Sequence, residues 1–194
     1  MEYEIDIPAE EEIKKLRVGD IVYITGIMVT ARDEAHKKAI EMDERGEALP
    51  IDFSQVAIFH CGPIMKKNEE WKVVAAGPTT SSRMELFEDE FLKRFGTKII
   101  VGKGGMGERT TKACKEYGAI YCAFTGGAAV LAAQAIKKVR DVFWLDELGM
   151  PECLWVFDVE RFGPLTVTID THGNNLTEDV KKKAIALLKK ENYK

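Results

Sequence analysis

Alternation between strand-like and helix-like segments is the feature that most constrains how this 194-residue chain can fold. Four times, an apolar run is followed by a short polar or glycine-rich loop and then by a segment with helical spacing. The loops are residues 30–33 (TARD), 77–83 (GPTTSSR), 102–109 (GKGGMGER) and 125–127 (TGG). Such alternation is typical of a mainly parallel sheet with right-handed crossovers. We therefore predict an α/β fold with a ligand site at the carboxyl ends of the strands, where these loops meet.

Apolar periodicity and turn residues predict the individual elements. Strands are expected at 20–30, 98–101 and 119–124, and a pair of strands at 56–60 and 72–76. Helices are expected at 31–45, 84–95, 108–117 and 128–139. The segment from 153 to 173 reads as a C-terminal hairpin that turns at RFGP. An amphipathic helix with Thr177 as its N-cap follows it.

Composition favours one globular domain spanning residues 1–194. The chain has 28 basic and 32 acidic side chains and a net charge of −4, so nucleic acid is not an expected partner. The acidic N-terminus lacks the apolar segment of a secretory signal. The uncharged stretch Tyr117–Ile136 is long enough to span a bilayer, but glycines and Gln134 interrupt it. We interpret it as a buried strand, a turn and a buried helix, and we expect a cytoplasmic protein without membrane contact.

The cysteines predict no metal centre. Cys61, Cys114, Cys122 and Cys153 form no CxxC pair and match no zinc or iron–sulfur spacing. Buried core positions are therefore expected for all of them. His60 precedes Cys61 in a predicted strand, where adjacent side chains point to opposite faces, so it is not placed to activate that thiol.

Three cations lie in or beside the strand-to-helix loops: Arg32, Arg83 and Lys103. The hydroxyls of Thr79 and Thr80 accompany them, and helix N-termini add unpaired N–H donors. This combination indicates a small anionic ligand, either a phosphate or a dicarboxylate. The guanidinium fork suits a carboxylate, since it donates two parallel hydrogen bonds. The alternative is that each cation lies on the surface or pairs with a neighbouring acid.

The run from Gly102 to Gly107 matches the pattern G-x-G-x-x-G between a strand and a helix. A dinucleotide site would also need an acidic residue near the end of the next strand, and none is there. Glu108 stands where a P-loop requires lysine. A nucleotide is therefore not the expected ligand. The roles of His36 and His60 stay open, and His172 is expected to serve a turn.

The loop sequences resemble a known family. The runs TARDEAHKK, HCGPIM, AAGPTTSSRM, VGKGGMGERT and AFTGGAAVLAA occur in the order seen in the β subunit of two-subunit class I fumarate hydratases. The same unit forms the C-terminal domain of single-chain class I enzymes and is shared with the β subunit of tartrate dehydratase. The resemblance covers residues 7–174. In the first loop Ala31 replaces the usual glycine and leaves the cation in place.

This resemblance implies a swivelling β/β/α domain with a mainly parallel central sheet. It implies a four-iron four-sulfur cluster held by three cysteines of a separate α subunit, with none bound by this chain alone. The expected partners are that α subunit and a dicarboxylate substrate. An α/β hetero-oligomer is expected, with a β homodimer as an alternative for the isolated chain.

The resemblance also implies residue roles. Arg32, Arg83 and Lys103 would bind the substrate carboxylates, and Thr79 would be the catalytic base, with Thr80 left as the alternative. The implied reaction is the reversible hydration of fumarate to (S)-malate. The alternatives are the β subunit of L(+)-tartrate dehydratase and a non-catalytic anion-binding or assembly module.

Overall fold

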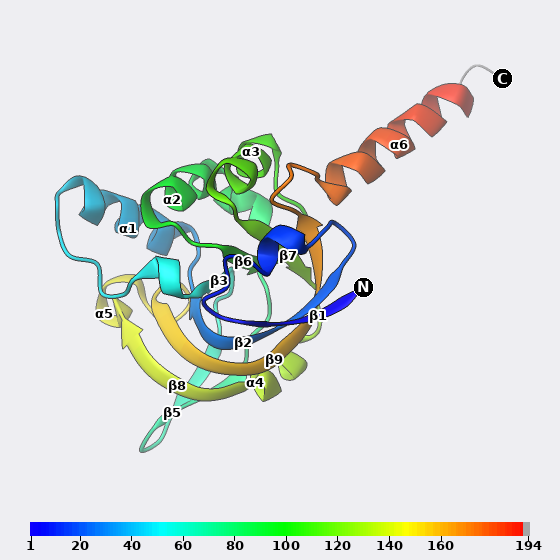
Figure 1. The fold of residues 1–194 in the computed structure, drawn as a ribbon. Coiled ribbons are helices and arrows are strands. Elements are labelled where there is room, and N and C mark those ends of the chain that lie inside the picture. The colour runs from blue at the N-terminus through cyan, green and yellow to red at the C-terminus, as the bar shows by residue number, and fades with distance from the viewer. Residues whose placement is uncertain (192–194) are drawn as a thin grey trace.

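A seven-stranded sheet in the order β1-β2-β3-β6-β7-β9-β8 organises the chain, as a computed structural model shows (Figure 1). The model describes residues 1–191, and their side chains as far as residue 189. The sheet strands are β1 (Glu2–Asp6), β2 (Ile21–Thr30), β3 (Ala57–Phe59), β6 (Ile99–Gly102), β7 (Ile120–Phe124), β8 (Ile136–Phe143) and β9 (Leu154–Ile169). A separate two-stranded sheet contains β4 (Ile64–Lys67) and β5 (Trp71–Ala75).

Helices connect most of these strands. The α-helices are α1 (Asp33–Glu44), α2 (Glu88–Phe95), α3 (Glu108–Tyr117), α4 (Ala129–Ala135), α5 (Leu145–Leu148) and α6 (Leu176–Glu191). Short 3-10 helices are η1 (Ile13–Lys15), η2 (Phe53–Gln55) and η3 (Ser81–Leu86). Strands and helices alternate through the middle of the chain, which confirms the predicted α/β class.

The sheet closes on itself through β9. Strands β2, β3, β6 and β7 run parallel to their neighbours, and β9 pairs antiparallel with both β7 and β2. Five strands therefore form a closed ring, to which β1 and β8 are attached. Closure leaves none of these five strands as a free edge along its paired length.

Both faces are buried in β3, β6 and β7, the inner parallel strands of the ring. In β3, Ala57 and Phe59 point into the largest core cluster, whereas Ile58 packs toward α1 and α2. In β7, Ile120 and Cys122 share that first cluster, whereas Tyr121 lies in the core under α2 and α3. Successive side chains of a strand point to opposite faces. Burial on both faces explains why these strands read as unbroken apolar runs.

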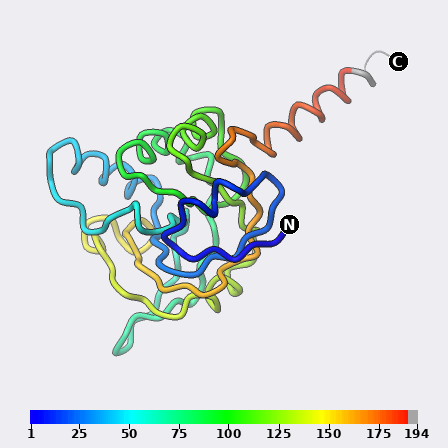
Figure 2. The backbone as a smooth tube through the Cα atoms, viewed as in Figure 1, coloured from blue at the N-terminus to red at the C-terminus, as the bar shows by residue number. Residues whose placement is uncertain are grey.

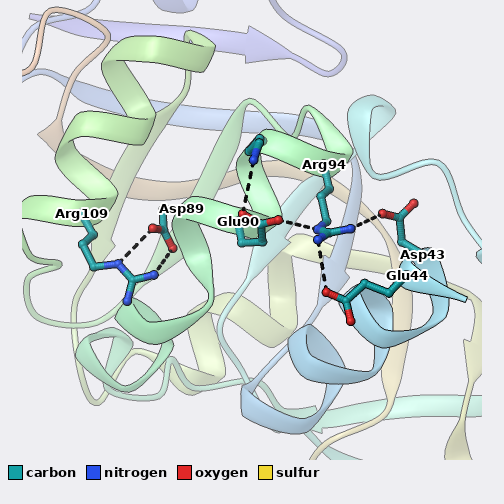
Figure 3. Close-up of polar contacts among 7 residues, drawn as sticks. Asp43, Glu44, Asp89, Glu90, Arg94 and Arg109 are labelled. Carbon is teal, nitrogen blue, oxygen red and sulfur yellow. Dashed lines mark hydrogen bonds and ion pairs between the residues drawn. The ribbon is translucent and has the colours of Figure 1, made fainter.

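Helices α1, α2 and α3 lie next to one another over one face of the sheet (Figures 1 and 2). Ion pairs link them: Arg94 of α2 contacts Asp43 and Glu44 at the end of α1, and Arg109 of α3 contacts Asp89 of α2 (Figure 3). Exposed pairs of this kind contribute at most about 1 kcal/mol each. The apolar contacts beneath the helices therefore hold the layer together.

Two strand pairings differ from the sequence predictions. The segments 56–60 and 72–76 do not pair: β3 lies between β2 and β6, and β5 pairs with β4. The predicted turn at RFGP is absent as well, because β9 runs unbroken from Leu154 to Ile169. Arg161 has φ 49°, and the register of β9 with β2 shifts between Phe162 and Leu165, but the strand continues without reversing. The strand before it in the chain, β8, is a further antiparallel neighbour of β9.

Two helix predictions also need correction. The helix predicted over 128–139 ends at Ala135, and residues 136–143 form β8 instead. It is not fully buried either, since Val130 and Leu131 are exposed. Asn175, rather than Thr177, caps α6: its side-chain oxygen accepts a hydrogen bond from the backbone N–H of Glu178. Helix α6 projects away from the sheet (Figure 2).

No helix among residues 1–191 is long and apolar enough to cross a membrane. The stretch 117–136 contains a strand followed by a helix, as predicted. These are β7 and α4, and α4 is shorter than the predicted helix.

A buried hydroxyl joins β2 to β9 and provides a test of the ring closure. Thr30 Oγ1 accepts a hydrogen bond from the Trp155 N–H at 3.0 Å and lies 3.2 Å from the Cys153 carbonyl. Thr30→Val leaves both backbone groups unsatisfied and should lower the free energy of unfolding by about 1–3 kcal/mol. Denaturant unfolding measures this, with exposed Thr125→Val as the control. Equal stability of the two variants would contradict the assigned role.

Candidate functional site

The predicted site loops meet at one edge of the ring. The parallel strands β2, β3, β6 and β7 end there, which brings together the loops that carry Arg32, Lys103 and the 125–127 turn. Gly126 lies beside Lys103, since a Cβ on Gly126 would be 3.3 Å from the lysine Cδ. The structure therefore brings these loops together at the carboxyl ends of the strands, as their alternation with the helices predicted.

The loop 77–83 reaches this edge by an unexpected route, because it follows β5 of the small sheet. It runs between the extended ends of β3 and β6. Pro78 forms a bridge with Cys61, and Thr80 forms one with Lys103. The Thr79 N–H donates to the His60 carbonyl at 2.7 Å. Backbone pairing thus fixes this loop between two neighbouring strands.

Each of the two arginines faces a carboxylate. Arg32 Nη2 lies 3.0 Å from Glu152 Oε1, and both side chains are 19% exposed. Arg83 is half exposed and forms an ion pair at 2.5 Å with Asp33. Lys103 has no carboxylate within 4.0 Å of its ammonium group among the side chains described. The segments that carry the three cations adjoin one another: Arg83 pairs with Asp33, the residue after Arg32, and Thr80 forms a bridge with Lys103. The two arginines also show the acid pairing that the sequence left open.

Two helix N-termini at this edge are already occupied by the protein's own carboxylates. Glu85 accepts hydrogen bonds from the backbone N–H groups of Gly107 and Arg109 at the start of α3, at 2.7 and 3.0 Å. Glu152 accepts one from the Glu34 N–H at the start of α1. These donors are therefore not unpaired, in contrast to the expectation from the sequence. The side-chain cations are the other positive groups at this edge.

The loop hydroxyls differ in their surroundings. Thr79 is half-buried and Thr80 is exposed, and η3 begins without a side-chain hydrogen bond at its N-cap, Thr80. Ser81 is fully buried. Neither threonine caps the short helix, so both hydroxyls remain available at the site edge.

Beneath the loops lies a fully buried group of ionisable side chains, the His–Glu–His cluster, formed by His36 of α1, His60 after β3 and Glu88 of α2. Glu88 Oε2 is 3.0 Å from His60 Nε2 and 3.6 Å from His36 Nε2. None of these atoms has an aligned hydrogen-bond partner. The attraction within the cluster is therefore chiefly electrostatic.

The second nitrogen of each ring indicates its protonation state. His36 Nδ1 lies 2.8 Å from the Arg32 carbonyl, which only accepts, so this nitrogen carries a proton. Its Nε2 faces the Glu88 carboxylate and must be protonated as well to be attracted to it. Burial alone lowers the pKa of His36, but the adjacent Glu88 carboxylate outweighs it, and the pKa is raised. His36 is therefore the cationic member.

His60 is the neutral member of the cluster. Burial, which the attraction of Glu88 does not offset, lowers the pKa of His60. Its Nδ1 lies 2.9 Å from Ser81 Oγ, and Nε2 carries the proton that faces Glu88. Burial acts to raise the pKa of Glu88, but the two imidazoles outweigh it and hold the pKa at about 2. One cation and one anion then balance inside the protein.

The His–Glu–His cluster is also the one group of residues, in the part of the chain that the structure describes, whose side-chain types suit a metal ion. All its ligand atoms lie within 4.8 Å of one another. However, the 3.0 Å contact between His60 and Glu88 is shorter than the roughly 3.3 Å that separates two ligands of tetrahedral zinc. Charge balance also accounts for the cluster without an ion. We interpret it as a buried ionic cluster whose two Nδ1 atoms form hydrogen bonds with Arg32 and Ser81.

The four cysteines do not form a cluster-binding set. All are free and buried, as predicted. Burial raises the pKa of Cys61 to about 12 and that of Cys153 to about 11, and it also raises the pKa of Cys114 and Cys122. No cysteine belongs to a group of three or more close metal-ligating side chains in the part of the chain that the structure describes. Cys61 points into the apolar core and His60 to the opposite side, as the strand geometry predicts.

The sequence reasoning missed the acidic partners of the site. Glu88 belongs to the buried face of α2 with Phe91 and Leu92, and an acidic residue at an apolar-face position was the available signal. The local sequence does not predict the hydrogen bonds of Glu85 and Glu152, because the N–H groups that donate to them lie on other elements. A cavity of about 610 Å³ between β5 and β8 lies apart from these loops.

Comparisons with known proteins identify the family to which the chain belongs. A family described as Fumarase C-terminus matches residues 2–180. A protein of Methanocaldococcus jannaschii, provisionally named L(+)-tartrate dehydratase subunit beta, is 50% identical over 94% of both chains. The L(+)-tartrate dehydratase subunit beta of Escherichia coli is 50% identical over 89% of this chain and 84% of its own.

A longer relative also matches. A Geobacillus stearothermophilus protein, provisionally named fumarate hydratase class I, is 44% identical over 92% of this chain, which corresponds to 34% of that protein. The family resemblance noted in the loop sequences is confirmed by these matches.

The ionised Glu88 makes stability dependent on pH in a defined window. Its folded pKa of about 2 lies below the unfolded value of 4.5, so its contribution is present above pH 4.5 and is lost as pH falls toward 2. The difference corresponds to about 3 kcal/mol at neutral pH. Glu88→Gln should remove this acid dependence and destabilise the protein at pH 7.

Denaturant unfolding between pH 7 and 2.5 measures the effect, with Glu69→Gln, an exposed carboxyl of the β4–β5 turn, as the control. A Glu88→Gln variant with the same acid profile as the parent would show that Glu88 is not the buried anion.

Proposed function

Because the chain belongs to the fumarase C-terminus family, we propose that it is the β subunit of a class I fumarate hydratase. Together with an α subunit, it would catalyse the reversible hydration of fumarate to (S)-malate. The observation that carries this proposal is that the segments bearing Arg32, Arg83 and Lys103 adjoin one another beside a threonine-bearing loop at one sheet edge.

The cations suit a four-carbon dicarboxylate with a charged group at each end. Two guanidinium groups supply paired donors for carboxylates, and Lys103 supplies a point charge that no acid among the described side chains neutralises. Removal of a proton beside a carboxylate builds negative charge on that carboxylate. Fixed cations stabilise this charge without having to reorganise during the reaction.

Thr79 is the residue that we assign as base for the substrate carbon. A threonine hydroxyl is a weak base unless nearby positive charge favours its alkoxide. Thr79 adjoins Thr80, which pairs with the backbone of Lys103. The absence of a capping contact for Thr80 at the start of η3 leaves the loop hydroxyls without a competing structural role there.

The four-iron four-sulfur cluster belongs to the α subunit in this proposal. The buried, scattered thiols of this chain do not suit cluster ligation, so no step is assigned to them. The name subunit beta carried by the relatives supports a partner chain. The sheet edge with its exposed Arg83 would then face that partner, and the two chains would complete the site together.

L(+)-tartrate is the second candidate substrate. The relatives at 50% identity carry the name tartrate dehydratase, whereas the relative at 44% carries the name fumarate hydratase. The substrates differ by one hydroxyl. The cations described here would bind the carboxylates of either one.

Reconstitution separates these possibilities. The chain alone should bind no iron after anaerobic incubation with iron and sulfide and should show no turnover. The same preparation mixed with a cysteine-bearing α chain should dehydrate malate, tartrate or both, and the ratio of kcat/KM identifies the substrate. A stable cluster with turnover on the isolated chain would contradict the two-chain proposal. Dicarboxylate binding by the complex without turnover would favour a non-catalytic module.

The hydroxyl that acts as base can be identified by a matched pair of substitutions. Thr79→Val removes the hydroxyl at nearly constant shape and should lower kcat of the α/β complex by about 100-fold or more. Its melting temperature should change little, and Thr79→Ser should recover part of the activity. Thr80→Val is the counterpart variant. A large loss in Thr80→Val together with an active Thr79→Val would transfer the role to Thr80.

A further inference from the structure

We propose that Ser81, which sits on the His–Glu–His cluster, is a positioning residue that holds the loops of Thr79 and Lys103 in place for substrate. This inference rests on the proposed hydro-lyase function and assigns to the buried cluster a role in that reaction. Ser81 itself is fully buried and does not reach the site surface. It therefore acts through its neighbours.

Ser81 joins two loops through three contacts. Its Oγ accepts a hydrogen bond from the Lys103 N–H at 3.1 Å, and its own N–H donates to the Lys103 carbonyl at 3.0 Å. The third contact is the 2.9 Å approach of Oγ to His60 Nδ1. Because Oγ accepts from Lys103 and His60 Nδ1 carries no proton, the hydroxyl hydrogen points to His60. Every hydrogen-bonding group in this arrangement has a defined direction.

The residues of the cluster also contact the backbone of the other residues that are proposed to bind substrate. The His60 carbonyl accepts the Thr79 N–H at 2.7 Å, and His36 Nδ1 donates to the Arg32 carbonyl at 2.8 Å. Glu88 holds the two imidazoles toward each other from α2. Each contact ends on the backbone of a residue whose side chain is proposed to meet substrate. A shift of the cluster would therefore be transmitted to Arg32, Thr79 and Lys103 together.

Gly102 provides independent evidence that space is reserved for the Ser81 hydroxyl. A Cβ at position 102 would lie 1.8 Å from Ser81 Oγ and 3.1 Å from His60 Nδ1. Gly102 does not have a positive φ, so its backbone conformation does not require glycine. Close approach of the serine hydroxyl is the reason for a glycine here. Gly102→Ala should displace the hydroxyl while Ser81 itself is retained.

The test compares variants in the α/β complex. Ser81→Ala leaves the Lys103 N–H and His60 Nδ1 without partners and should lower kcat/KM by about 10- to 100-fold, the cost of a small misplacement of catalytic groups. The loss should appear in kcat as well as in KM. Gly102→Ala should lower kcat/KM to a similar extent, because the added methyl group would displace the Ser81 hydroxyl.

Thr97→Val is the control for lost stability. The buried Thr97 hydroxyl donates to the Phe53 carbonyl away from the loops, so its removal weakens the fold without touching the cluster. Thr97→Val should retain kcat/KM within about twofold. An equal loss of activity in Thr97→Val and Ser81→Ala would show that Ser81 matters only for stability, and an active Ser81→Ala would overturn the proposal.

Amide hydrogen exchange gives a readout that does not depend on activity. In the full chain, Ser81→Ala should speed exchange of the Lys103 amide by about tenfold or more relative to that of Ile100 in the preceding strand, β6. Thr97→Val should leave this ratio unchanged. If the parent complex shows no hydro-lyase activity, the proposed function fails. The exchange ratio still decides whether Ser81 orders the loop, and an unchanged ratio in Ser81→Ala would refute the inference.

Discussion

The buried charge of Glu88 is the constraint on which the candidate site depends. An ionised carboxylate without exposure to solvent is costly unless a cation neutralises it, and here two imidazoles converge on it. Their remaining nitrogens must then find partners, and they find them at Arg32 and Ser81. Ionic and hydrogen-bonding contacts thus link α2 to the loops after β2, β3 and β6.

In the proposed function, recognition of an anion at this edge would rely on side chains, although helix N-termini are close by. Glu85 and Glu152 occupy the N–H groups that begin α3 and α1. Internal capping leaves those helices stable in the absence of ligand and leaves Arg32, Arg83 and Lys103 as the positive groups. The partnership of Arg83 with Asp33 holds its guanidinium near the edge, and Lys103 remains the cation without such a partner among the described side chains.

Backbone pairing explains how a loop from outside the ring reaches the candidate site. Strand β5 belongs to the small sheet, yet residues 78–81 pair with the backbone of Cys61 and Lys103. This pairing places Thr79 and Arg83 beside residues that follow β2 and β6. In the proposed complex, the exposed hydroxyl and guanidinium groups would lie where the α subunit brings its cluster. The His–Glu–His cluster and Ser81 would hold the backbone of these residues in position.

The sequence by itself determined the α/β class, most element positions and the gathering of Arg32, Thr79, Arg83 and Lys103. Those features follow from local periodicity, glycine stops and the common direction of parallel strands. It did not determine that β9 runs unbroken, that α4 ends at Ala135, or that 56–60 and 72–76 belong to different sheets. Strand pairing depends on partners distant in the sequence, which local pattern does not specify. For the same reason the tertiary structure alone decided the cluster of His36, His60 and Glu88, because three ionisable groups on three elements become one unit only when burial removes water from between them.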